Sequence, residues 1–186
     1  MKEWVEALKE YKVLLGEPEK EELKRISYDS RKAEAGDLFL CMKGSKLDSH
    51  DKIPELLEKG VRLFVVEKEL EDLPAELGKT EGLSVIKVEN ARAALARLSA
   101  CYFHYPAKEM LMIGITGTKG KTTTASMVRS ILEEAGYRTG LIGTTGIDYA
   151  GIHEESRNTT PESYTLQETF RKMKEAGCDA VVMEAS

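Results

Sequence analysis

The sequence predicts an α/β protein in which a mixed α/β domain is followed by the start of a parallel-sheet domain. Short apolar runs alternate with amphipathic segments of helical period, as in strand–helix–strand units. The alternation restarts after His104-Tyr-Pro106, which indicates a domain boundary near 105–109. A glycine-rich turn after the first strand of the second series then opens a helix. We therefore expect domains over 1–107 and 108–186.

The first series contains three predicted helices and four predicted strands. The helices are expected over 3–10, 51–59 and 90–103, and the strands over 26–29, 37–42, 61–66 and 85–88. The first helix is expected to place Trp4, Val5, Leu8 and Tyr11 on one side. Gly60 is a helix stop, and Asn90 is an N-cap for the last helix.

The second series contains three predicted strands and two predicted helices. The strands are expected over 110–115, 139–143 and 179–184, and the helices over 122–135 and 163–176. A turn at Tyr149-Ala-Gly151 is expected to lead into an irregular polar stretch. Sheets average roughly five to six strands, so this domain is expected to be incomplete, with its last strands as exposed edges.

Composition excludes several classes of protein. The 186 residues include 27 Lys and Arg against 32 Asp and Glu, a net charge of −5, which does not suit a nucleic-acid or membrane partner. Apolar runs such as 63–66 are far shorter than the roughly 20 residues of a membrane span, and no signal core follows Met1. Cys41, Cys101 and Cys178 match no metal spacing and are expected to be reduced packing thiols. We expect a cytoplasmic monomer.

The strongest functional signal runs from Gly114 to Thr124, where a strand leads through glycines into Gly-Lys-Thr at a helix start. Glycines let backbone N–H groups converge on phosphate oxygens, and the helix N-terminus attracts the same anion. Lys121 can reach the β- and γ-phosphates, and the Thr122 hydroxyl can bind Mg²⁺. Ile115 stands where the general phosphate-loop pattern has glycine, and a plain strand-to-helix turn is the alternative. A dinucleotide fingerprint is absent.

A carboxylate at the end of the last predicted strand complements this loop. Ala180-Val-Val-Met-Glu184 is an apolar strand that ends in an acid. The carboxyl ends of parallel strands lie at the edge of the sheet where a phosphate loop sits. Glu184 is therefore a candidate Mg²⁺ ligand, directly or through water, and a solvated acid at a strand end is the alternative.

At these residues the sequence resembles the Mur ligase family, the ATP-dependent amide-forming enzymes of peptidoglycan synthesis. Thr116-Gly-Thr-Lys-Gly-Lys-Thr122 resembles the family's TGTNGKT loop, with Lys119 in place of Asn, and Met183-Glu-Ala-Ser186 resembles its MEVSSH segment. Tyr28-Asp-Ser-Arg31 and Ala35-Gly-Asp-Leu-Phe39 resemble the DSR…GDLF signature of the N-terminal substrate domain. Asn158-Thr-Thr-Pro161 resembles the NTTP segment of one branch. That branch adds a diamino acid to UDP-N-acetylmuramoyl-L-alanyl-D-glutamate.

The resemblance implies a set of site residues, with ATP and Mg²⁺ as cofactors. The ATP-binding residues would be Gly117, Thr118, Lys119, Gly120, Lys121, Thr122 and Thr123, with Lys121 also catalytic. Thr122 and Glu184 would serve the metal. Ser30 and Ser45 would contact the uridine nucleotide, and Asn158, Thr159, Thr160 and Ser186 the peptidyl part of the substrate. Through these residues, the family phosphorylates the D-glutamyl carboxylate, and an amine then attacks the acyl phosphate.

Several alternatives stay open at this point. Asp29-Ser-Arg31 also fits a polar turn, and Thr160-Pro-Glu-Ser163 a helix N-terminus. Ser49 and Lys52 differ from the family's DGHDF-like run, where His50 is expected to be a surface or capping residue. The family has further domains beyond this region, so the 186 residues alone are expected to lack ligase activity. A folylpolyglutamate-type ligase and a non-catalytic nucleotide- or UDP-sugar-binding module are the other hypotheses.

Overall fold

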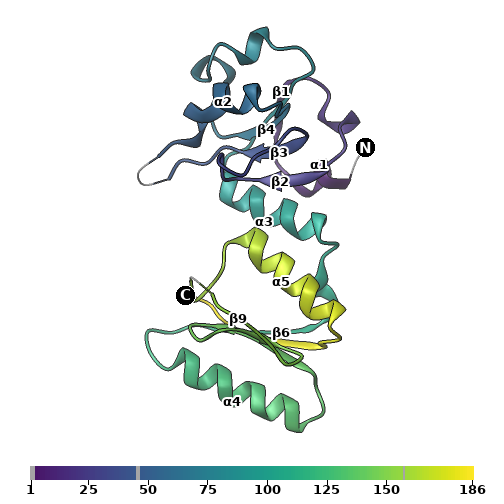
Figure 1. Cartoon of the computed structure of the whole chain (residues 1–186), viewed down its shortest axis with the longest axis vertical. Helices are drawn as coiled ribbons and strands as arrows, with labels where there is room; N and C mark the ends of the chain where they lie inside the picture. The colour runs from purple at the N-terminus through teal and green to yellow at the C-terminus, as the bar shows by residue number, and fades with distance from the viewer. Residues whose placement is uncertain (1–2, 45–46, 157) are drawn as a thin grey trace. The chain divides into compact units, whose positions relative to one another are not determined.

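The protein is described by a computed structural model over residues 3–44, 47–156 and 158–186. It divides into two compact units, Met1–Tyr102 and Phe103–Ser186, and each contains a five-stranded sheet (Figure 1). Both sheets are mixed, and α-helices pack on them. The α/β fold class is therefore confirmed, although the break between the units comes a few residues before the boundary predicted at 107.

The sheet of the first unit is mainly parallel. Its order is β1 (Lys12–Leu15), β5 (Ser84–Lys87), β4 (Leu63–Val66), β3 (Asp37–Leu40) and β2 (Arg25–Ser27). The four strands β2 to β5 are parallel to their neighbours, and β1 is antiparallel to β5. The apolar runs of β3 and β4 are buried on both faces, as expected of central parallel strands.

In its described residues, this unit also has three α-helices. They are α1 (Glu3–Ala7), α2 (Ile53–Glu58) and α3 (Ala91–Tyr102), and α1 packs against α3. The unit also contains short 3-10 helices: η1 (Pro18–Lys20), η2 (Ser49–Lys52), η3 (Leu70–Asp72) and η4 (Leu77–Lys79). The Asn90 side chain accepts a hydrogen bond from the Ala93 N–H at 2.9 Å, so the predicted cap of α3 is confirmed.

Two predictions for the first unit are wrong. The helix over 3–10 ends at Ala7, because Lys9 adopts a left-handed backbone conformation with φ of 66°. Tyr11 is consequently exposed, whereas Trp4, Val5 and Leu8 are buried. Strand β1 is not predicted, because it is an edge strand whose apolar residues are exposed (Val13) or half-buried and it lacks a long apolar run.

The second unit has three parallel strands followed by an antiparallel hairpin. Its sheet order is β6 (Leu111–Ile115), β10 (Ala180–Glu184), β7 (Thr139–Gly143), β8 (Gly146–Tyr149) and β9 (Ile152–Glu154). Figure 1 shows α4 (Lys121–Glu134) on one face of this sheet and α5 (Ser163–Glu175) on the other, with the 3-10 helix η5 (Pro106–Glu109) before β6. In β10, Val181 packs with α5 and its neighbour Val182 packs with α4.

The sequence-based prediction for this sheet is therefore wrong in three respects. The second unit has five strands in its described residues, not three: β9 lies where an irregular stretch is predicted, and β8 lies before the predicted turn, where no strand is predicted. The predicted turn between them is confirmed, with Ala150 and Gly151 at φ of 47° and 79°. The last strand is not an edge, because β10 pairs with both β6 and β7, and the edges of the sheet are β6 and β9. The sheet is mixed, not parallel, because β8 is antiparallel to β7 and β9.

The burial of the three cysteines and of His50 can be compared with the predictions for these side chains. Cys41, Cys101 and Cys178 are free and buried, as expected of packing thiols. The prediction of a surface position for His50 is wrong, because the residue is only 1% exposed. Its Nδ1 contacts Asp48 Oδ1, and its Nε2 accepts a hydrogen bond from the Glu67 N–H at 3.1 Å. His50 thus joins the segment after β3 to the end of β4.

Replacing His50 with alanine is expected to lower the free energy of unfolding by about 2 kcal/mol, because the partly buried Glu67 N–H loses its acceptor and a cavity forms. Urea denaturation followed by circular dichroism measures the change. His153→Ala, at an exposed ring, is the control and should change stability by less than about 0.5 kcal/mol. Equal stability of the two variants would contradict this role.

Candidate functional site

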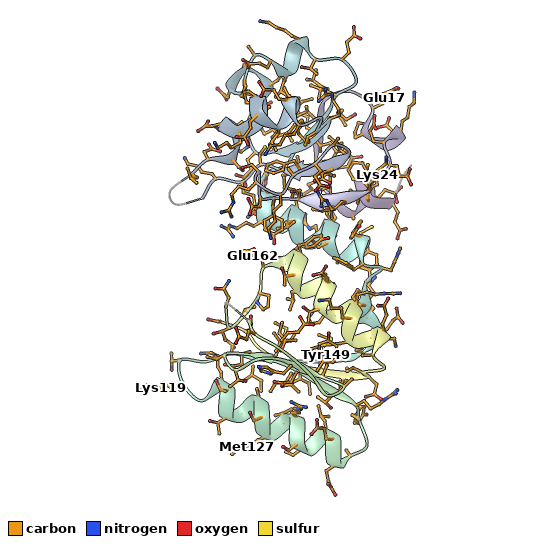
Figure 2. The ribbon with its side chains drawn as sticks, viewed as in Figure 1. Glu17, Lys24, Lys119, Met127, Tyr149 and Glu162 are labelled. Atoms are coloured by element: carbon orange, nitrogen blue, oxygen red, sulfur yellow. The ribbon has the colours of Figure 1, made fainter. Side chains whose placement is uncertain are left out.

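The predicted phosphate loop connects the carboxyl end of β6 to the N-terminus of α4. Gly120 is the N-cap residue of α4 and has φ of 79°, a left-handed conformation that a side chain would strain. The first N–H groups of α4 have no partner within the helix and point at the space in front of the loop. Lys119 lies at the outer tip of this loop, and Met127 projects from α4 away from the sheet (Figure 2).

Lys121, the first residue of α4, lies over the loop. Its ammonium donates a hydrogen bond to the Gly117 carbonyl at 2.8 Å. This contact keeps a positive charge beside the N-terminus of the helix. A phosphate group at this place would meet both the ammonium and the backbone N–H groups.

Glu184 ends β10 with a buried carboxylate, so the predicted alternative of a solvated acid is wrong: the residue is 1% exposed. Thr122 Oγ1 donates to Glu184 Oε2 at 3.0 Å, and the Thr144 N–H donates to Oε1 at 3.0 Å. Thr144 Oγ1 lies 3.3 Å from Oε2. Within the described ranges the carboxylate has hydroxyl and amide donors but no ion-pair partner. A buried carboxylate without a cation is costly, which favours a bound metal ion.

Gly143, the last residue of β7, allows Glu184 to take this position. A Cβ atom on Gly143 would lie 2.2 Å from Glu184 Oε1 and 2.9 Å from its Cδ. No real side chain tolerates such distances, so the absence of a Cβ creates the space that the carboxylate occupies. The close approach also puts the Thr144 N–H within reach of Oε1.

The oxygen atoms of Thr122 and Glu184 fit the demands of Mg²⁺. Two ligands at neighbouring positions of an octahedral Mg²⁺, each about 2.1 Å from the ion, lie about 3.0 Å apart. The observed distance between Thr122 Oγ1 and Glu184 Oε2 is 3.0 Å. Among the described residues, no group of three His, Cys, Asp or Glu side chains could hold a metal by itself. A cation here would therefore also need phosphate or water oxygens, which is how Mg²⁺ is commonly bound with nucleotides.

The segment 158–160 lies against the end of β10. Thr160 Oγ1 donates to the Glu184 carbonyl at 2.8 Å and accepts from the Ser186 N–H at 2.9 Å. Thr159 Oγ1 lies 3.2 Å from Thr144 Oγ1. The carbonyl of Asn158 accepts a hydrogen bond from Ser156 Oγ at 2.6 Å. The helix-capping alternative is wrong for Thr160: the N-cap of α5 is Glu162, whose side chain makes no capping hydrogen bond.

The predicted uridine-contacting residues belong to the first unit. Ser30 follows β2, and its carbonyl accepts a hydrogen bond from Lys59 Nζ at 2.7 Å. Asp29 and Arg31 form a bidentate pair with distances of 2.9 and 2.7 Å, which lowers the pKa of Asp29 to about 2. The polar-turn alternative therefore describes the local structure of 29–31 correctly. Ser45 lies outside the described residues.

Sequence reasoning missed Gly143 and Thr144, which shape the carboxylate site. Both lie in Gly143-Thr-Thr-Gly146, at the carboxyl end of β7, beside β10 in the sheet. The carboxyl ends of parallel strands meet at one edge of a sheet, and this rule placed Glu184 near the loop. Because residues 143–146 also follow an apolar strand, the same rule could have placed Gly143 and Thr144 there.

A cavity of about 310 Å³ lies elsewhere in the second unit, near the start of β7. Arg129, Tyr137, Arg138 and Cys178 are among its lining residues, and none of the predicted site residues lines it. The candidate site is instead a surface at the carboxyl ends of β6, β10 and β7. Among the described helices, none is long and apolar enough to cross a membrane.

Comparisons with known proteins match both units. Residues 22–103 match the model of the Mur ligase family, catalytic domain, and residues 115–186 match the Mur ligase middle domain. A UDP-N-acetylmuramoyl-L-alanyl-D-glutamate–2,6-diaminopimelate ligase of Clostridium perfringens is 43% identical over 95% of this chain and 35% of that protein. The ligase of the same name from Bacillus licheniformis is 46% identical over 87% of this chain and 31% of that protein.

A solved structure described as a UDP-N-acetylmuramoyl-L-alanyl-D-glutamate–2,6-diaminopimelate ligase has the same fold. The TM-score is 0.65 at 22% identity, over 88% of this chain and 32% of the other. The chain therefore spans about a third of the length of the curated relatives and of this structure.

Proposed function

Because the chain belongs to the Mur ligase family, we propose that it provides the UDP-substrate-binding and ATP-binding parts of a peptidoglycan ligase. The proposed reaction is the ATP-dependent addition of a diamino acid to UDP-N-acetylmuramoyl-L-alanyl-D-glutamate. The names of the relatives favour 2,6-diaminopimelate as that amino acid. In this proposal, residues 1–107 bind the uridine nucleotide and residues 108–186 bind ATP.

One observation carries this proposal: the phosphate loop, the Glu184 carboxylate and the segment 158–160 meet at one edge of one sheet. Thr122 Oγ1 connects the loop to Glu184 at 3.0 Å, and Thr160 Oγ1 connects the segment to the Glu184 carbonyl at 2.8 Å. Phosphoryl transfer to a carboxylate needs the nucleotide, a cation and the acceptor in one place. The arrangement therefore supports a site where a triphosphate and a peptidyl carboxylate come together.

The proposed roles follow from the chemistry of each group. Residues 117–123 hold the phosphates through backbone N–H groups, and Lys121 offsets their negative charge. Thr122 and Glu184 hold Mg²⁺, which supplies the charge that lets two anions approach. Asn158, Thr159, Thr160 and Ser186 position the peptidyl carboxylate, and Ser30 and Ser45 bind the uridine nucleotide. ATP phosphorylates the D-glutamyl carboxylate to an acyl phosphate. The amine of the diamino acid then attacks the carbonyl carbon of this acyl phosphate, and phosphate leaves as the amide forms.

A cytoplasmic location and a monomeric state without nucleic-acid or membrane partners also belong to the proposal. The three buried free cysteines support a reducing compartment. The net charge of −5 supports the absence of a nucleic-acid partner.

Isothermal titration with UDP-N-acetylmuramoyl-L-alanyl-D-glutamate tests this function. The chain is expected to bind this compound at least tenfold more tightly than UDP-N-acetylmuramoyl-L-alanine, which lacks the carboxylate-bearing residue. The pair Thr159→Ala/Thr160→Ala should remove most of that tenfold difference, because it removes two hydroxyls at the proposed carboxylate site.

Ser163→Ala, at the first residue of α5, is the matched control for the hydroxyl loss and should keep the tenfold difference. Equal affinity for the two UDP compounds in the unaltered chain would contradict the proposed substrate. Binding of dihydrofolate in place of either compound would instead support a folylpolyglutamate-type ligase.

A further inference from the structure

A continuous chain of side-chain oxygen atoms runs across the candidate site. Thr122 Oγ1 lies 3.0 Å from Glu184 Oε2, which lies 3.3 Å from Thr144 Oγ1, which lies 3.2 Å from Thr159 Oγ1. One end of the chain belongs to the phosphate loop, and the other belongs to the segment proposed to bind the peptidyl carboxylate. Thr144 is the member that no motif in the sequence assigns to either function.

Thr144 is also the main support of the Glu184 carboxylate. Of the three hydrogen bonds that described residues donate to this carboxylate, Thr144 provides two, one from its N–H and one from its hydroxyl. Because Gly143 leaves room for the carboxylate directly beside it, Thr144 sits where it can support both carboxylate oxygens. The orientation of Glu184 therefore depends on the residue that also contacts Thr159.

The chemistry of a hydroxyl group makes this contact directional. A hydroxyl has one proton, so when Thr144 Oγ1 donates to Glu184 it can only accept from Thr159. The hydroxyl of Thr159 is then turned toward Thr144 by its own donation. A cation bound by Glu184 makes its carboxylate a weaker acceptor, so Thr144 Oγ1 can donate to Thr159 instead, and the Thr159 proton is then free for the peptidyl carboxylate.

We propose that Thr144 is a positioning residue that couples the two halves of this site, so that magnesium–nucleotide at the phosphate loop and the UDP-linked peptide at 158–160 bind cooperatively. This inference rests on the proposed function. A cation held by Thr122 and Glu184 fixes the carboxylate, and Thr144 transmits that order to Thr159. By thermodynamic linkage, each ligand must then increase the affinity for the other by the same factor.

Titration of the chain with UDP-N-acetylmuramoyl-L-alanyl-D-glutamate tests this coupling, with and without saturating Mg²⁺ and a β,γ-imido analogue of ATP. The analogue is expected to tighten substrate binding about five- to tenfold, within the usual range of allosteric coupling. In Thr144→Val the ratio of substrate affinities with and without the analogue, the coupling factor, should fall below about two, because valine has no hydroxyl. Valine keeps the β-branched shape and the backbone N–H of threonine. The coupling factor is a ratio of two substrate affinities measured on the same variant, so it is compared between variants whatever their affinity for each ligand alone.

Two further variants separate the hydroxyl from general effects on the loop. Thr144→Ser retains the hydroxyl and should restore most of the coupling. Thr145→Val makes the same change at the neighbouring exposed threonine and should keep the full factor. Thermal unfolding of all three variants checks that they fold.

The outcomes distinguish this inference from the function on which it rests. Failure of the unaltered chain to bind either ligand would overturn the proposed function and the coupling with it. Binding of both ligands without mutual enhancement, or enhancement that survives in Thr144→Val, would overturn the coupling alone. Loss of the coupling in Thr145→Val as well would also contradict a specific role for Thr144.

Discussion

Replacing Lys121 with alanine is expected to weaken binding of a magnesium–ATP analogue about 30-fold, which corresponds to about 2 kcal/mol. The ammonium lies next to the N-terminus of α4, and it is held over the loop by its hydrogen bond to the Gly117 carbonyl at 2.8 Å. A charge-assisted hydrogen bond to phosphate would be lost. Equilibrium titration with a fluorescent ATP analogue measures the effect.

The same substitution should leave the fold intact, because the Gly117 contact of Lys121 is exposed. The free energy of unfolding is expected to change by less than about 0.5 kcal/mol. Lys174→Ala removes a charge of the same sign from α5 and is the control for the change in net charge. Affinity within threefold of the unaltered chain for Lys121→Ala would rule out the phosphate-binding role.

Replacing Gly143 with alanine is expected to lower the free energy of unfolding by about 3 kcal/mol and to abolish the Mg²⁺ dependence of nucleotide binding. The new Cβ would lie 2.2 Å from Glu184 Oε1, so a buried carboxylate must move away from its donors. Gly143 does not have a positive φ, so backbone strain does not contribute to this cost. Chemical denaturation and nucleotide titration with and without Mg²⁺ measure the two effects.

A double-mutant cycle identifies Glu184 as the cause. In a Glu184→Ala background the space beside Gly143 is open, and Gly143→Ala should then cost less than about 1 kcal/mol. Gly114→Ala is the matched control, because this strand glycine of the same sheet has no atom within 4 Å of an added Cβ. An equal cost of Gly143→Ala in both backgrounds would show that the carboxylate is not the obstacle.

The elements of this protein that sequence patterns predicted well are those with strong local signals. The apolar runs that became β3, β4, β7 and β10 are buried on both faces, and such runs are recognisable without knowledge of their partners. The helices α3, α4 and α5 combine helical periodicity with clear start or stop signals such as Asn90, Gly136 and Gly177. Strands β1, β8 and β9 were missed because none of them is a continuous buried apolar run: β1 and β9 lie at sheet edges and have exposed residues, and Asp148 interrupts β8.

In the candidate site, too, the residues with a local sequence signal were predicted and those without one were missed. The loop 117–123 and Glu184 were predicted because a phosphate-binding loop and an acid at a strand end are each local patterns. Gly143 and Thr144 were missed, since neither has a local chemical signature. The burial of His50 was missed for the same reason. Its Nε2 accepts a hydrogen bond from the N–H of Glu67, which follows β4 and lies 17 residues further along the chain.

The sequence alone determined which groups this protein has for its chemistry: a helix-opening phosphate loop with Lys121 and Thr122, an acid at the end of an apolar strand, and the Asn158-Thr-Thr-Pro161 segment. Only the tertiary structure decided that these groups meet. Pairing of β10 between β6 and β7 brings Glu184 beside both the loop and Gly143, although the three lie far apart in the chain. Strand order arises from burial of many side chains at once, so no single motif encodes it. That order places Thr144 between the Glu184 carboxylate and Thr159.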